Sequence, residues 1–182
     1  MSSVTVASKL VLSKTNAEIK RLMVDCIYSG RGHQQAGQFW SAVSHWIGIP
    51  SAIISSVLGV GAAGSALLGN NVFSAILAIL SVILAGLNTY LKPKEIADSH
   101  LLKGAQFISI RNRARILKEV ELISGLPQKD IAEKLIRLRS EYDALIIKSP
   151  RNIPKFAYKA AKKSISNGES DYENDPLWKT LD

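Results

Sequence analysis

A run of 60 residues without a charged side chain constrains this sequence more than any other feature. From Gly32 to Leu91 there is no Asp, Glu, Lys or Arg, so all 23 basic and 15 acidic residues lie in the rest of the chain. A water-soluble domain covers much of its surface with charged groups, and a neutral block of this length is not expected in one. The sequence therefore excludes an ordinary soluble globular domain and indicates contact with lipid.

The neutral block divides into two predicted membrane spans, residues 46–68 and 72–91, within a hairpin at 44–91. The sequence Gly69-Asn70-Asn71 between them is a strong turn signal, and a turn this short makes the spans antiparallel. Each span reaches the length of about 20 apolar residues that crosses a bilayer. A signal peptide fits poorly because the block begins far from Met1 without a basic segment beside it. A buried soluble hairpin would need an apolar partner surface that the charged remainder cannot supply.

The charges on either side of the hairpin predict its orientation. Both flanks are net basic and the turn is neutral, so the positive-inside rule places both termini of this multi-pass protein in the cytoplasm. Trp40, Trp46 and Tyr90 suit anchors at the cytoplasmic interface. Basic residues beside an anionic leaflet also account for the net charge of +8. Nucleic-acid binding is the alternative, but no nucleic-acid motif is present, so no nucleic-acid partner is expected.

Small residues form a stripe along each predicted span. Such stripes allow helix backbones to approach closely where lipid gives no hydrophobic driving force. They either hold the hairpin together or face neighbouring subunits and a water-filled path, and two spans alone cannot enclose a channel, so a pore requires a homo-oligomer. The candidate pore-lining or helix-packing residues are Ser51, Ser55, Gly59 and Ala63 in the first span, and Ser74, Ala78, Ser81, Ala85 and Asn88 in the second.

The segments around the hairpin also predict helices. In residues 1–43, Thr15-Asn16-Ala17-Glu18 is typical of a capping box, and the helix that follows it should break near Gly30-Arg31-Gly32. In residues 92–148, Pro93 suits the first position of a helix that continues over residues 94–124. The expected apolar stripe of that helix comprises Ala105, Ile108, Asn112, Ile116, Val120 and Ile123.

The helix after Gly125-Leu126-Pro127 has a clearer seam, with apolar residues spaced four, three, four and three apart. This is the a/d pattern of two heptads, and it predicts an antiparallel pair with the preceding helix. The seam packs either between these two helices of one chain or between the chains of an oligomer. Its members are Ile131, Leu135, Leu138, Tyr142 and Leu145.

Residues 149–182 form a basic amphipathic segment and an acidic tail. The basic part, residues 156–165 with the preceding Lys155, suits an anionic surface. The acidic part, residues 167–182, is expected to be disordered or ordered by a partner, with Leu177 and Trp178 as a docking anchor.

Catalytic chemistry has no visible basis in the sequence. The three histidines share no metal-ligand spacing, and Cys26 is the only cysteine and lies on the apolar face of a helix. The Gly59-Val60-Gly61-Ala62-Ala63-Gly64 match to a dinucleotide-binding motif lies in a predicted span and lacks the required downstream acid. We therefore expect no enzyme activity, no catalytic residues, no metal site and no cofactor.

Together these features describe an all-α membrane protein: a two-helix transmembrane hairpin, an N-terminal amphipathic helix and a C-terminal cytoplasmic antiparallel pair. A Trp-containing entry at Phe39-Trp40 and Trp46, two spans rich in Ser, Ala and Gly, and His100 in the long helix after them resemble the SLATT domain. That name stands for the SMODS and SLOG-associating two-transmembrane effector domain. The resemblance covers roughly residues 13–148.

The resemblance implies a function in a bacterial conflict or anti-phage system. Proteins of this kind look like inner-membrane effectors paired with a nucleotide second-messenger synthase, a nucleotide sensor or a reverse transcriptase. On a trigger such as a nucleotide signal, they are expected to oligomerise in the lipid bilayer and open a pore. The alternative is a non-conducting membrane anchor or scaffold that presents its cytoplasmic helices to a partner protein.

Overall fold

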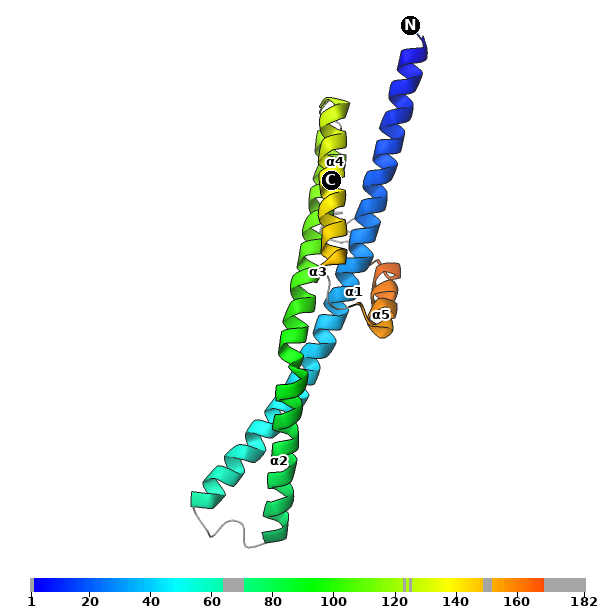
Figure 1. Cartoon of the computed structure of the whole chain (residues 1–182). Helices are drawn as coiled ribbons and strands as arrows, with labels where there is room; N and C mark the ends of the chain where they lie inside the picture. Colours follow the sequence, from blue (N-terminus) through cyan, green and yellow to red (C-terminus); the bar gives the residue numbers. More distant parts are fainter. Residues whose placement is uncertain (1, 64–70, 123, 125, 149–151, 169–182) are drawn as a thin grey trace, which may run out of the picture. The chain divides into compact units, whose positions relative to one another are not determined.

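The described parts of the chain are almost entirely helical. The computed structural model describes residues 2–63, 71–122, 124, 126–148 and 152–168 (Figure 1). The end of the first predicted span (residues 64–68), Gly69, Asn70 and the predicted acidic tail from residue 169 on, with Leu177 and Trp178, lie outside the described residues. The all-α fold class is confirmed. The elements are α1 (Ser2–Ala63), α2 (Asn71–Leu91), α3 (Pro93–Ile116), the π-helix η1 (Leu117–Glu121), α4 (Gln128–Ile147) and α5 (Lys155–Ser166).

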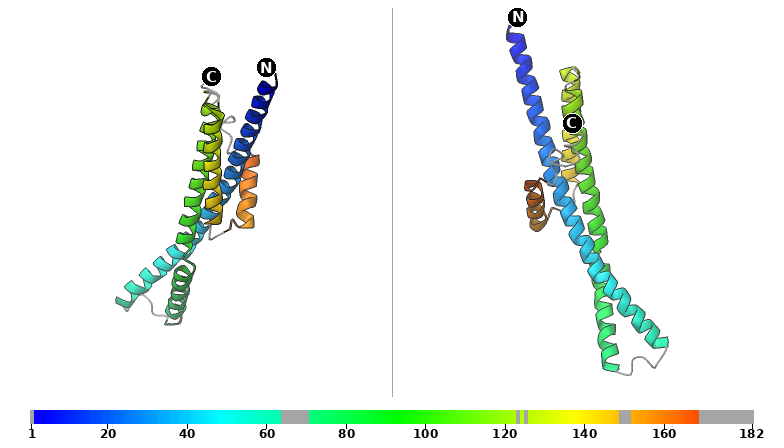
Figure 2. Two further views of the ribbon diagram at one scale, coloured as in Figure 1. Left: turned by 45° about the horizontal axis from the view of Figure 1, so that its top comes forward. Right: turned by 180° about the vertical axis from the view of Figure 1, so that it is seen from behind.

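The chain forms two compact units, and α1 and α3 each contribute residues to both of them. The hairpin unit comprises residues 37–100, and the bundle unit comprises residues 1–36 and 101–182. The hairpin unit thus contains the second half of α1, all of α2 and the start of α3. The bundle unit contains the first half of α1, the remainder of α3, and η1, α4 and α5 (Figure 2).

Helix α1 is much longer than the sequence predicts. It runs from Ser2 to Ala63 with Pro50 inside it, so the predicted break near Gly30-Arg31-Gly32 is wrong. The predicted capping box is also wrong as a helix start, because it lies inside α1. There Glu18 forms an ion pair with Arg21 one turn further along the same helix.

Gly30 and Gly32, on which the predicted break was based, lie at close contacts within the bundle unit. A Cβ on Gly104 of α3 would lie 3.1 Å from the Gly30 carbonyl oxygen of α1 and 2.9 Å from Cγ of Gln34. A Cβ on Gly32 would lie 2.9 Å from Cδ1 of Ile153, in the segment before α5. Glycine has no Cβ, so it allows two backbones to approach where any other residue would collide. At Gly30 and Gly32, glycine permits close packing, and α1 continues through both residues.

The core of the bundle unit lies where α1, α3, η1 and α4 meet. The stripe that α3 and η1 contribute is Phe107, Ile110, Ala114 and Leu117, spaced three, four and three residues apart. The predicted stripe is therefore wrong at positions 105, 116 and 120, which are exposed, whereas Ile108 and Asn112 are half-buried. Ile116 and Val120 are 50% and 58% exposed, and Ile123 lies outside the described residues. The other core residues are Ile19, Leu22 and Cys26 of α1 and Ile131, Leu138 and Tyr142 of α4.

All five residues of the predicted α4 seam contribute to this intrachain core. Leu135 and Leu145 pack against it as partly buried neighbours of the buried three. Ion pairs join the helices around the core: Glu141 with Arg113, Glu121 with Lys134, and Asp25 with Arg139 at 3.0 Å. Such exposed pairs orient helices more than they stabilise them, so apolar burial supplies most of the stabilisation.

Helices α2 and α3 are separated by a single residue. Lys92 has a φ of 45°, a left-handed conformation that is unfavourable for a residue with a side chain. A residue before proline is also disfavoured in the right-handed helical region, which places the interruption at Lys92. Pro93 begins α3, as predicted, and its missing N–H costs nothing in the first turn.

Candidate functional site: the membrane hairpin

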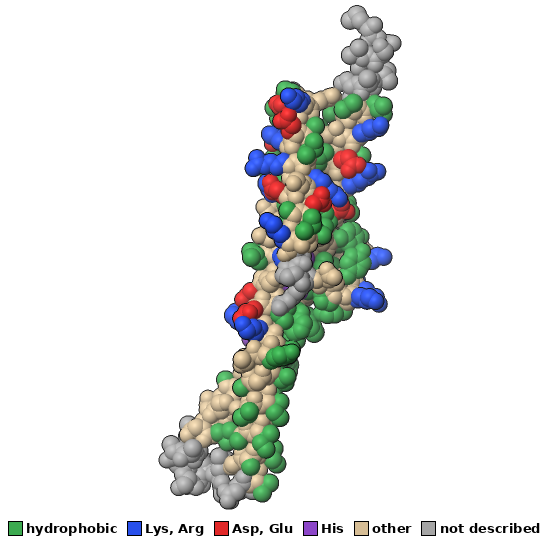
Figure 3. Space-filling model, viewed as in Figure 1, with side chains coloured by type: hydrophobic (Ala, Val, Ile, Leu, Met, Phe, Trp, Pro, Cys, Tyr) green, Lys and Arg blue, Asp and Glu red, His purple; other side chains and the backbone are tan. Residues whose placement is uncertain are grey.

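The two helices of the hairpin unit are covered with apolar side chains. Charged side chains are absent from most of its surface and dense over the bundle unit (Figure 3). Two helices of the chain are long and apolar enough to cross a membrane, with mean hydropathy of 1.3 for the best window of α1 and 2.2 for that of α2. Patches of this size are unfavourable in water and favourable in lipid. The large exposed residues include Ile49, Ile53 and Val57 of α1 and Ile76, Ile79, Val82 and Ile83 of α2.

One face of each helix packs inside the hairpin unit. Ser81 of α2 is 8% exposed, and its hydroxyl oxygen lies 2.7 Å from that of Ser55 on α1. The less exposed positions continue from this hydrogen bond at spacings of three and four, which is the period of a helix-packing seam. The seam consists of Ser51, Ile54 and Leu58 on α1 and Ser74, Leu77, Ser81 and Leu84 on α2.

The predicted small-residue stripes coincide with this seam only in part. Ser51 and Ser74 are half-buried, and Ser55 bonds to the buried Ser81. The remaining members, apart from Ala63, are exposed. We call them the outer small-residue set: Gly59, Ala78, Ala85 and Asn88. Ala63 ends α1, and its side chain lies outside the described set.

Polar side chains on the spans find hydrogen-bond acceptors within their own helix. The Ser56 hydroxyl donates to the Ala52 carbonyl at 2.8 Å, and the Thr89 hydroxyl donates to the Ala85 carbonyl at 2.9 Å. Lipid offers no partners, so such bonds to the preceding turn remove the cost of burying a hydroxyl in it. His45 is similar, since its Nδ1 lies 2.7 Å from the Ser41 carbonyl oxygen. This is the geometry of a hydrogen-bonded structural histidine.

Aromatic residues expected at the membrane interface are on the surface of the hairpin unit. Trp46 is 80% exposed and Tyr90 is 86% exposed. Trp40 is half-buried and makes an edge-to-face contact with Phe39 at a centroid distance of 5.7 Å. Trp and Tyr with exposed rings are favourable at the level of lipid headgroups, so Trp46 and Tyr90 suit that depth.

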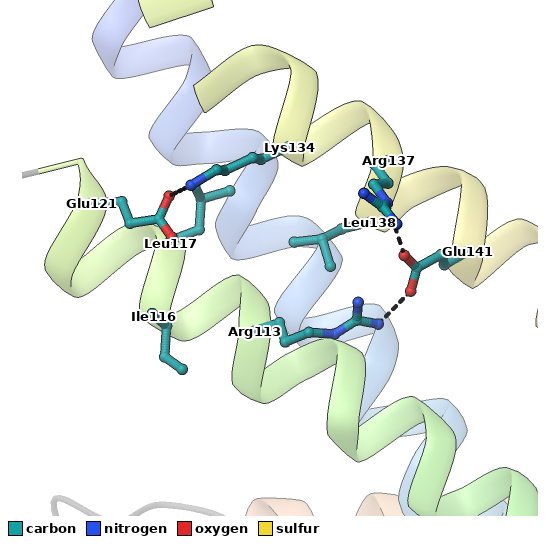
Figure 4. Close-up of a pocket in the computed structure, with 8 residues that line it drawn as sticks. All are labelled: Arg113, Ile116, Leu117, Glu121, Lys134, Arg137, Leu138 and Glu141. Carbon is teal, nitrogen blue, oxygen red and sulfur yellow. Dashed lines mark hydrogen bonds and ion pairs between the residues drawn. The ribbon is translucent and has the colours of Figure 1, made fainter. Parts of the chain in front are cut away.

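The bundle unit contains a groove that the sequence did not indicate. It has a volume of about 370 Å³ and lies between α3, η1 and α4 (Figure 4). Leu117, Leu138 and Ile116 provide its apolar walls. Five charged side chains surround them, and within the groove Glu141 pairs with Arg113 and Arg137 while Lys134 pairs with Glu121. The charges therefore neutralise one another almost completely. No sequence motif joins these residues, because they come together only when α3 and α4 pair.

The surroundings of the bundle core shift the pKa values of several ionisable groups, among them Glu141 and Cys26. A hydrogen bond from Arg113 lowers the pKa of Glu141, which favours the carboxylate. Burial and, to a smaller extent, the adjacent Asp25 charge raise the pKa of the Cys26 thiol to about 12. A thiol with this pKa is protonated at neutral pH and is a poor nucleophile.

The buried histidine of the bundle unit packs against an aromatic ring. His33 is 4% exposed and stacks on Phe107 with ring centroids 5.7 Å apart. Across the described ranges, no group of three or more His, Cys, Asp or Glu side chains is arranged to hold a metal ion. The apolar hairpin and the packed bundle support association with a membrane and packing of helices.

Comparison with known proteins agrees with this geometry. The model of a two-transmembrane effector family matches residues 16–175, which is most of the chain. The match includes both spans and the helices of the bundle unit through α5. Nothing matched among curated proteins or among solved structures. The chain is a membrane protein that belongs to the SMODS and SLOG-associating 2TM effector domain family 4.

Proposed function

We propose that this protein is the membrane effector of a bacterial conflict or anti-phage system, which assembles in the inner membrane and opens a water path. The family supplies the effector and two-transmembrane assignments. Homo-oligomerisation, pore opening and a trigger such as a nucleotide signal from a partner enzyme or a reverse transcriptase are our inference. The basic flanks support a topology with both termini in the cytoplasm.

The outer small-residue set is the observation that carries the proposal. The packed seam of the hairpin uses Ser51, Ser74 and Ser81, whereas Gly59, Ala78, Ala85 and Asn88 stay exposed. An exposed carboxamide such as that of Asn88 is costly in hydrocarbon and favourable against a neighbouring helix or water. Small residues beside it allow that helix to come close. A second copy of the hairpin provides the neighbouring helix, and an open pore provides the water.

Induced expression with a membrane-potential dye tests the proposal. Asn88→Leu and Ala78→Leu fill the outer small-residue set and should reduce both depolarisation and killing. Val82→Leu is the matched control, since Val82 is a 72% exposed apolar residue of the same helix. A purified protein that is monomeric in mild detergent and leaves the membrane potential intact, even when its system is triggered, would contradict the proposal.

A non-conducting anchor or scaffold is the second candidate function. The groove beside Leu117 and Leu138 favours it, because a bundle with an open groove offers a partner protein a place to bind. Replacing residues 44–91 with an unrelated two-span hairpin separates the two candidates. A scaffold would keep its activity after the exchange, whereas a pore-forming effector would lose it.

A further inference from the structure

Beyond the proposed function, we propose that the outer face of α5 binds the anionic headgroups of the bilayer in which the same chain is embedded. The inference rests on three properties of α5: the separation of its two faces, the absence of ion pairs between its lysines and the described residues, and the exposure of its aromatic rings.

The two faces of α5 differ in chemistry and in environment. Its inner face consists of small residues, Ala157, Ala161 and Ser164, which are buried in the bundle unit. Its outer face contains every charged residue of the helix, and all of them are basic. These are Lys155, Lys159, Lys162 and Lys163, which we call the α5 lysines, and each is exposed.

The α5 lysines differ from most of the other basic residues of the bundle unit. On α3 and α4, cations such as Arg113, Lys134 and Arg139 face carboxylates of neighbouring helices. None of the α5 lysines forms an ion pair with any described residue. Four like charges within three helical turns repel one another. An anionic surface outside the protein would relieve that repulsion.

Aromatic rings beside the lysines fit a lipid interface. Phe156 is 47% exposed and Tyr158 is 48% exposed. Lysines together with exposed aromatic rings are typical of helices that lie in the headgroup region. The Tyr158 ring also contacts Tyr28 of α1 at a centroid distance of 6.3 Å, so the inner edge of α5 stays attached to α1. The contact with lipid should therefore be mainly electrostatic, made at the surface, with little insertion.

Charge complementarity and proximity favour lipid over nucleic acid as the partner. The hairpin unit holds the chain in a bilayer, which gives anionic headgroups a high effective concentration near any basic surface of the same molecule. The α5 lysines occupy a helix of 12 residues without acidic residues, and no nucleic-acid motif extends this surface. Each lysine beside an anionic leaflet should strengthen binding about fivefold, the equivalent of about 1 kcal/mol.

The test uses the full-length protein in nanodiscs, with an environment-sensitive dye on Ser166→Cys at the end of α5 in a Cys26→Ala background. Discs contain phosphatidylcholine alone or a mixture with phosphatidylglycerol, and quenching by spin-labelled headgroups reports contact with lipid. We expect strong quenching only in the anionic discs, with a decrease in high salt. Changing all four α5 lysines to Gln should abolish the difference between the lipids, and changing them to Arg should preserve it. Circular dichroism of each variant checks that α5 remains folded.

Two results would overturn the proposal. One is quenching that is equal in both lipids, or that the Gln variant retains in full. The other is a change in neutral discs on adding duplex DNA or RNA that equals the effect of phosphatidylglycerol at the same phosphate concentration. That second result would assign the α5 lysines to nucleic acid.

Discussion

The hairpin unit and the bundle unit are built from the same long helices but follow opposite packing rules. In the bundle unit, Phe107, Leu117 and Leu138 are buried and charged groups cover the outside. In the hairpin unit, Ile79, Val82 and Ile83 are exposed, and a serine is the most buried residue of α2. The solvent makes this difference, because water drives large apolar residues inward and lipid does not.

The comparison also shows what small residues do in each unit. Gly30 and Gly104 lie at a contact where an added Cβ would collide. Gly59 and Gly86 of the hairpin unit have open space around the position of a Cβ. In the bundle unit these glycines allow close contacts between helices of the same chain. In the hairpin unit, some of the small residues contact no other helix among the described residues.

The largest expected effect comes from the centre of the bundle core. Phe107→Ala removes a buried ring that contacts His33 and Tyr142, and should lower the free energy of unfolding by about 3–5 kcal/mol. Urea-dependent modification of Cys26 by a maleimide in detergent reports unfolding, because this buried thiol becomes reactive only when the bundle opens. Ile136→Ala is the control, since Ile136 is 68% exposed and its loss should cost less than about 0.5 kcal/mol. Equal losses for both variants would contradict the described core.

A glycine comparison sharpens the contrast between the units. Gly104→Ala should destabilise the bundle by about 1–3 kcal/mol, because its Cβ would meet the Gly30 backbone at 3.1 Å. Gly86→Ala should be neutral or stabilising in the same assay of the monomer in detergent, since nothing lies within 4 Å of its Cβ and alanine favours a helix. A neutral Gly104→Ala would mean that the two helices do not meet at this crossing.

The charged groove of the bundle unit predicts that the stability of the bundle depends on pH. The pKa of Glu141 is lowered in the folded state by Arg113, so its contribution to stability is present above the ordinary carboxyl pKa and is lost as pH falls through the folded value. Unfolding of wild type and of Glu141→Gln, measured from pH 7 downward, should differ most at neutral pH and converge in acid. A difference that is constant across this range would show that the carboxylate does not stabilise the bundle.

The smallest expected effect is at the hydrogen bond between the spans. Ser81→Ala removes the 2.7 Å contact with Ser55 and should destabilise the hairpin by about 0.6 kcal/mol. Thr89→Ala removes a hydrogen bond within one helix and should leave span association unchanged. Pulling single molecules apart in a bilayer patch resolves differences of this size. A larger effect for Thr89→Ala than for Ser81→Ala would contradict the seam.

Hydropathy and proline predicted the fold better than glycine and capping residues did. The neutral block from Gly32 to Leu91 predicted two spans, and Pro93 predicted the start of α3, because neither prediction depends on tertiary contacts. The break at Gly30 and the capping box at Thr15 failed, since a glycine or a capping residue can stand inside a helix when tertiary contacts require it. The stripe of α3 was misplaced because Ala114, flanked by arginines, conceals the true seam.

The candidate site could be predicted only in part, for a related reason. Spacing identified the small residues of both spans, but deciding which of them pack and which stay exposed required the position at which the two helices meet. The bond between Ser55 and Ser81 marks that position, and Asn88, two turns further along the same side of α2, stays exposed. The groove at Glu141 could not be predicted, because its members are distant in the sequence and share no motif.

Membrane fractionation of cells that express the intact chain tests the central claim most directly. The account predicts that the protein sediments with membranes, remains there after washing with alkaline carbonate, and is released only by detergent. Recovery of the folded protein in the supernatant without detergent would contradict residence of the hairpin at residues 44–91 in lipid.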